Sequence, residues 1–146
     1  MQHRCYKKEK KKGVIRMDEK EKLEYYHKIF PEIFEYFGNL SKENKHFGNA
    51  INFIEKRMLQ NVKKIRVLDN MHKSMLGGYH IDGKEILICN TNNVKQNKDT
   101  LTHEMLHAIS TDNNGRSGFT KDFENKLGLT EAVTEDLKQK ILRKEY

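Results

Sequence analysis

His103-Glu104-Met105-Leu106-His107 lies within a segment that has the apolar spacing of an α-helix. The apolar positions of this segment are Leu101, Met105, Leu106, Ala108 and Ile109. On a helix, residues four apart lie one turn apart on the same face, so both imidazoles can bind one metal ion. Glu104 would then point toward a metal-bound water rather than toward the ion. We expect the helix to begin at Asp99 or Thr100, either of which is a suitable N-cap.

A catalytic zinc site of this kind needs three protein ligands and one open position, so a third ligand must come from elsewhere. One familiar arrangement places a glycine three residues and a histidine six residues after the second histidine, but Ser110 and Asn113 occupy these positions. Asp122 is conceivable, although its spacing matches no known pattern. Glu131 is the best candidate because Thr130 before it is a good N-cap for a further helix. The apolar residues of that helix have the right spacing, at Ala132, Val133, Leu137, Ile141 and Leu142.

Glu131 and Glu135 would lie one turn apart on one helix face, as the two histidines do. The pair of motifs, His103-Glu104-x-x-His107 and Glu131-x-x-x-Glu135, resembles the pattern of the gluzincin, or thermolysin-like, zinc metallopeptidases. The resemblance covers roughly residues 63–146. It implies that His103, His107 and Glu131 bind Zn²⁺. It also implies that Glu104 is the general base of peptide hydrolysis and that Glu135 orients His103 from the second shell.

Three short strands are predicted before the histidine-containing helix, at residues 64–68, 76–81 and 85–89. Asp82-Gly83 between the last two is a strong signal for a tight hairpin turn. The resemblance implies that the strand at 76–81 forms the rim of the cleft and pairs with an extended substrate peptide. Gly78, Tyr79 and His80 are therefore the candidate substrate-binding residues. Tyr79 or His80 could also replace the oxyanion donor that the family places after its ligand helix, although both also fit as ordinary edge-strand side chains.

The first half of the chain contains two further stretches with helical apolar spacing, before residue 38 and from residue 47 to 59. Pro31 should divide the first stretch into two pieces, Gly38-Asn39 should end it, and Ser41 should cap the second. We therefore predict one α+β domain over residues 17–146, similar to a small zincin. It would contain two N-terminal helices, a mixed sheet of about three strands, the HExxH helix and a C-terminal ligand helix.

The formal net charge of +7 is concentrated at the N-terminus. Residues 1–16 contain seven basic residues and one acidic residue, whereas the rest of the chain is nearly balanced. Such a run is typical of a disordered, solvated tail. Binding of this tail to nucleic acid or to an anionic lipid surface is the alternative interpretation.

Other features of the composition indicate a cytoplasmic protein. Cys5 and Cys89 do not form a disulfide framework, and the N-terminus lacks the apolar stretch of a secretory signal. No apolar run has the length of a membrane span.

The leading hypothesis is a zinc metallopeptidase that acts on a peptide or protein substrate. The alternative is a non-catalytic, metal-stabilised module that binds nucleic acid through residues 1–16. A structural zinc site has no need of Glu104 as a base, which favours the enzyme. A third interpretation assigns no functional site. In it, the two histidines lie on the solvated face of a helix, and Glu131 and Glu135 are acids that a helix dipole favours in the first turn.

Overall fold

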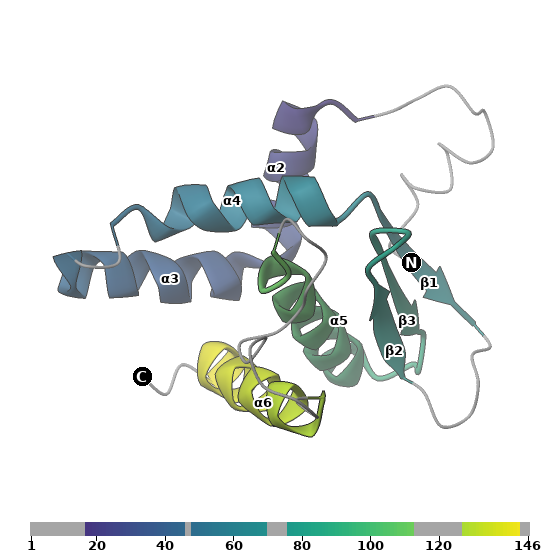
Figure 1. The fold of residues 1–146 in the computed structure, drawn as a ribbon. Helices are drawn as coiled ribbons and strands as arrows, with labels where there is room; N and C mark the ends of the chain where they lie inside the picture. Colours follow the sequence, from purple (N-terminus) through teal and green to yellow (C-terminus); the bar gives the residue numbers. More distant parts are fainter. Residues whose placement is uncertain (1–16, 46–47, 70–75, 113–126, 144–146) are drawn as a thin grey trace.

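The computed structural model describes residues 17–45, 48–69, 76–112 and 127–143, with the side chains of the last segment described from Glu131 onward. Within these ranges it contains five helices and three strands, which confirms the predicted α+β class (Figure 1). The elements are α2 (Glu19–Ile29), α3 (Pro31–Glu43), α4 (Ala50–Asn61), β1 (Lys64–Leu68), β2 (Gly77–His80), β3 (Glu85–Cys89), α5 (Val94–Ile109) and α6 (Leu127–Arg143).

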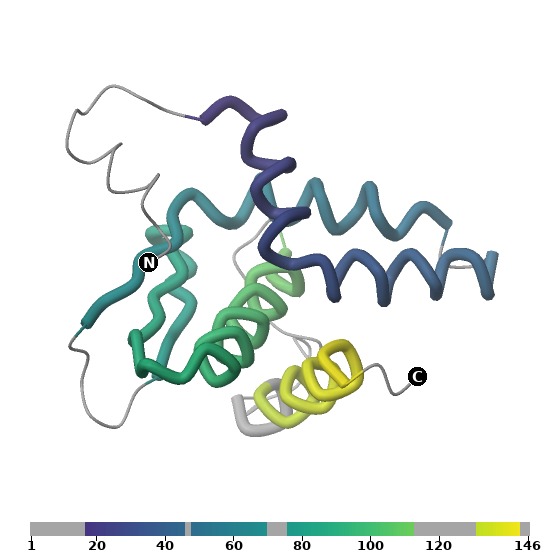
Figure 2. Tube along the Cα trace, turned by 180° about the vertical axis from the view of Figure 1, so that it is seen from behind, coloured from purple at the N-terminus to yellow at the C-terminus, as the bar shows by residue number. Residues whose placement is uncertain are grey.

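The sheet is mixed and has the strand order β1-β3-β2, with β1 parallel and β2 antiparallel to the central strand β3. Ile86 and Ile88 of β3 are buried, and the helices lie to one side of the sheet, as the opposite views in Figures 1 and 2 show. The turn between β2 and β3 falls at Asp82-Gly83 as predicted. Its left-handed residue is Lys84, with φ 52°, rather than the glycine.

The predicted boundaries of the N-terminal helices are partly wrong. Pro31 does begin a new helix, at a position where its missing N–H costs nothing. However, α3 continues through Gly38-Asn39, because packing of α3 against α4 outweighs the weak helix propensity of single residues. Asn49, not Ser41, caps α4 through a hydrogen bond from Asn52 N. Ser41 lies inside α3 and accepts a hydrogen bond from the backbone of Ala50.

Both later helices begin before the predicted caps. The side chain of Asn93 accepts from Gln96 N at 3.0 Å and caps α5, so Asp99 and Thr100 lie inside this helix. Helix α6 begins at Leu127, so Thr130 is not its N-cap either. The strands at 64–68 and 85–89 have the predicted bounds, and β2 is one residue shorter at each end.

Helix α4 holds the C-terminal end of α5. The last carbonyls of a helix have no partner within it. Asn61 Nδ2 donates to Ala108 O at 2.8 Å and to Thr111 O at 2.9 Å. The guanidinium of Arg57 donates to Ile109 O and Thr111 O, and its charge suits the negative end of the helix dipole. The helix that carries both histidines is therefore anchored directly after the second one.

None of the described helices has the length and apolar content needed to cross a lipid bilayer. Residues 1–16, to which the basic tail was assigned, and Asp122 lie outside the described residues.

Candidate metal centre

Helices α5 and α6 bring the three predicted metal ligands together. His103 Nε2 lies 2.9 Å from Glu131 Oε1, and His107 Nε2 lies 3.0 Å from Glu131 Oε2. The two Nε2 atoms are 3.1 Å apart. These three side chains form a group with one donor atom each within 4.8 Å of the others. The geometry thus comes from two i, i+4 positions on one helix and a carboxylate on the next.

The hydrogen-bonding chemistry of this group fits a bound cation. His103 Nδ1 lies 3.2 Å from Glu135 Oε1, which favours the proton on Nδ1 and leaves a lone pair on Nε2. That lone pair faces an oxygen of Glu131 and Nε2 of His107, so a proton or a metal ion must lie among them to prevent repulsion. In a tetrahedral site with bonds of about 2.1 Å, ligand atoms lie roughly 3.4 Å apart. The observed separations of 2.9, 3.0 and 3.1 Å are shorter than this value, and two imidazoles with one carboxylate are a usual zinc donor set.

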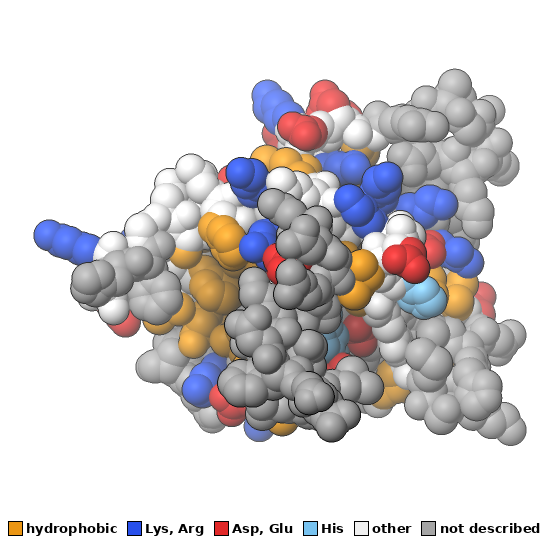
Figure 3. Space-filling view, viewed as in Figure 1, with side chains coloured by type: hydrophobic (Ala, Val, Ile, Leu, Met, Phe, Trp, Pro, Cys, Tyr) orange, Lys and Arg blue, Asp and Glu red, His pale blue; other side chains and the backbone are white. Residues whose placement is uncertain are grey.

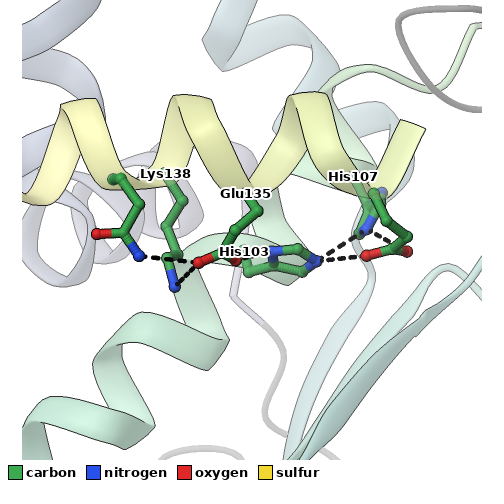
Figure 4. A network of polar contacts seen from close by, with 6 residues as sticks. His103, His107, Glu135 and Lys138 are labelled. Atoms are coloured by element: carbon green, nitrogen blue, oxygen red, sulfur yellow. Dashed lines mark hydrogen bonds and ion pairs between the residues drawn. The ribbon is translucent and has the colours of Figure 1, made fainter. Parts of the chain in front are cut away.

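Glu135 lies where a carboxylate can orient His103, and two neighbours on α6 hold it there (Figure 4). Glu135 Oε2 accepts from Lys138 Nζ at 2.9 Å and from Gln139 Nε2 at 2.8 Å. Burial would raise the pKa of Glu135, but these hydrogen bonds and the charge of Lys138 outweigh it and lower the pKa. Lys138 is only 7% exposed. Sequence analysis missed this residue, although its i, i+3 spacing from Glu135 was a usable signal.

Glu104 is buried next to the ligand group but is not one of the three converging residues. It is 8% exposed. Burial raises the pKa of Glu104 to about 7, the charge of Glu131 adds to this rise, and His103 opposes it. A carboxyl group with a pKa near neutrality can both take up and release a proton at physiological pH. Burial also lowers the pKa of His107, which favours the neutral imidazole that a metal ion requires.

A polar pocket of about 450 Å³ adjoins the centre and extends along α5 toward its N-terminus. Besides His103, Glu104 and Glu135, its lining comprises Leu76, Gly77, Gln96, Asp99, Thr100 and Lys138. A Cβ atom on Gly77 would lie 2.6 Å from Thr100 Cγ2 and 2.8 Å from Leu87 O. Glycine therefore allows the start of β2 to approach α5 more closely than any other residue could.

Of the β2 residues expected to bind substrate, none lines this pocket with its side chain. Tyr79 donates its hydroxyl to Asn61 O at 2.7 Å, and burial raises its pKa to about 12. Its hydroxyl is therefore engaged at the end of α4 and is not placed as an oxyanion donor. His80 is exposed at the end of β2, beside the turn. Gly78 lies on the edge strand, whose outward backbone groups are suited to pair with an extended peptide.

A second pocket, of about 350 Å³, is apolar and lies among α3, α4, α5 and α6. Hydrophobic side chains are visible at the surface over α3 and α4 in Figure 3. The two polar residues that line this apolar pocket already form hydrogen bonds. Arg57 donates to the backbone carbonyls at the end of α5, and Ser110 donates to His107 O. This pocket therefore offers no free polar group among the described side chains, and the metal centre is the better candidate for chemistry.

Comparison with protein-family models, with curated proteins and with solved structures finds no match for this chain.

Proposed function

We propose that the protein is a zinc-dependent metallopeptidase of the gluzincin type and that it acts in the cytoplasm. The observation that carries the proposal is the convergence of His103, His107 and Glu131 beside the buried carboxyl of Glu104. A purely structural centre would gain nothing from an acid held next to it at a cost in solvation.

In the proposed mechanism, His103, His107 and Glu131 would hold the ion. When bound, zinc would lower the pKa of a water molecule and polarise the substrate carbonyl. Glu104 takes the proton from the attacking water and later delivers it to the leaving amine. The ring of His103 is oriented by Glu135, whose other oxygen is held by Lys138.

Strand β2 would position the substrate. As an edge strand, it has backbone groups that point away from β3 and can pair with an extended peptide by β-augmentation. Close packing of Gly77 against α5 keeps this edge next to the metal centre. The substrate class that follows is a peptide or protein segment in an extended conformation.

The test compares wild type with Glu104→Gln, which keeps the shape of the side chain but removes the base. We expect Glu104→Gln to retain one zinc per chain and to lose cleavage of an unbiased peptide library by at least about a hundredfold. Glu24→Gln, at an exposed position on α2, is the matched control and should behave as wild type. His103→Ala should lose both zinc and activity. Equal cleavage by wild type and Glu104→Gln would disprove the mechanism.

One observation favours the alternative, a binding module. The backbone N–H groups of Lys63 and Lys64 both lie close to Lys84 O, at 2.7 and 3.4 Å, so three lysines of the folded part are neighbours. Figure 3 shows Lys and Arg side chains gathered where α4 leads into the sheet. With a basic tail, such a surface could bind phosphate groups, although weakly and with strong salt dependence.

A further inference from the structure

Three acidic side chains line the polar pocket beside the metal centre, and Asp99 is the one that is neither paired with a lysine nor assigned to the proposed chemistry. Asp99 lines this pocket and forms no ion pair with any described residue. Lys138, the positive residue of the lining, is already paired with Glu135 at 2.9 Å. Lys98, next to Asp99 in the chain, is paired with Glu32 at 2.6 Å. A cation that entered the pocket would therefore find a carboxylate available to it.

The position of Asp99 along α5 matches the length of a basic side chain. Asp99 precedes His103 by four residues, so it lies on the same helix face about 6 Å further along the axis. A lysine side chain, with its four-carbon stem, also spans about 6 Å. A substrate residue bound at the metal centre can therefore extend an ammonium or guanidinium group to Asp99, with Gln96 and Thr100 as polar neighbours.

The position of Glu104 indicates which residue of the substrate would have its side chain in the pocket. In the proposed mechanism Glu104 delivers the proton to the leaving amine, and Glu104 lines the same pocket. The side chain of the residue that supplies the leaving amine would therefore lie next to this pocket.

We propose that the pocket binds a lysine or arginine side chain on the leaving-amine side of the cleaved bond, and that Asp99 selects it. This inference rests on the proposed peptidase function. A charge-assisted hydrogen bond in a half-buried pocket favours the basic side chain over an apolar one of similar size by at least roughly tenfold.

The experiment uses zinc-loaded protein and peptides that differ only at the residue after the cleaved bond, which is lysine, arginine, leucine or glutamate. A further peptide carries its positive charge only as a free N-terminal ammonium. Wild type should show a kcat/KM at least about tenfold higher for lysine and arginine than for leucine. Asp99→Asn should lose this preference, and Asp99→Lys should reverse it toward glutamate. Asp82→Asn, at an exposed position in the β2–β3 turn, is the control and should keep it.

Three outcomes would overturn the inference: a lysine preference that survives in Asp99→Asn, a wild-type preference for glutamate, or a requirement for the N-terminal ammonium alone. Binding to zinc-loaded Glu104→Gln separates this inference from the proposed function. If no peptide is cleaved, the peptidase proposal fails, but tighter binding of the lysine peptide that is lost in Asp99→Asn/Glu104→Gln still supports the pocket. No preference in binding refutes the role of Asp99.

Discussion

Replacing Glu104 by glutamine is expected to stabilise the metal-free protein above neutral pH. Burial raises the pKa of Glu104 from 4.5 to about 7, so the folded protein retains a proton that the unfolded chain releases. A raised folded pKa contributes stability that is complete below the unfolded pKa and is lost as the pH rises through the folded pKa. The free energy of unfolding should therefore fall between about pH 4.5 and pH 7. The shift corresponds to at most about 3 kcal/mol.

Glutamine cannot ionise, so Glu104→Gln avoids this loss. The assay is urea unfolding of wild type and Glu104→Gln in the presence of a chelator, at pH 5 and at pH 8. The two proteins should differ little at pH 5, and Glu104→Gln should be more stable at pH 8 by up to about 3 kcal/mol. Glu24→Gln should show no such pH-dependent gain. If Glu104→Gln is no more stable than wild type at pH 8, the conclusion that burial raises the pKa of Glu104 is refuted. Saturation with zinc should reduce the gain, because the charge of the ion favours the carboxylate.

Two further outcomes test the surroundings of the centre. Lys138→Met should weaken zinc affinity by roughly tenfold or more, because Glu135 then loses the charged one of the two groups that hold it against His103. Lys138→Arg should restore most of that affinity in zinc competition. Equal zinc affinity of Lys138→Met and wild type would mean that Lys138 has no positioning role. Deletion of residues 1–16 should leave folding and zinc content intact and abolish any salt-sensitive binding to DNA, RNA or anionic vesicles, as measured by titration at several salt concentrations. Tight binding that remains after the deletion would instead implicate Lys63, Lys64 and Lys84.

The local geometry of the centre was predictable because each motif lies within one helix. His103 and His107 are four residues apart, as are Glu131 and Glu135, and helical periodicity alone places each pair on one face. The way in which α5 and α6 pack against each other depends on contacts between distant residues. The contact between these two helices, with His103 Nε2 2.9 Å from Glu131 Oε1, could therefore be inferred only from the family resemblance.

The predictions from sequence that were wrong or missing have identifiable physical causes. The first turn of α5 was missed because its residues are polar apart from Val94, which is exposed, so apolar periodicity does not reveal it. Asn93 was the available signal, as an N-cap residue three positions before Gln96. The role of Gly77 was not predictable, because the need for glycine arises from Thr100 and Leu87, which are distant in the chain. The hydrogen bond of Tyr79 was not predictable for the same reason, since its partner, the carbonyl of Asn61, is set by tertiary packing.

The carboxyl of Glu104 connects the energetics of the fold to the proposed chemistry. A buried acid whose pKa lies near 7 destabilises the metal-free protein at physiological pH, and a buried glutamine would serve the fold better. Positions at which a protein retains a destabilising ionisable group tend to be functional sites. Here the group lies beside three converging donor atoms and lines the polar pocket that contains Asp99. The same burial that costs stability brings the pKa of Glu104 into the range in which it can accept a proton from water and return it to an amine. If Glu104→Gln both stabilises the metal-free protein and abolishes hydrolysis, the two effects have one physical cause; if it does only the first, Glu104 is a buried acid without a catalytic role.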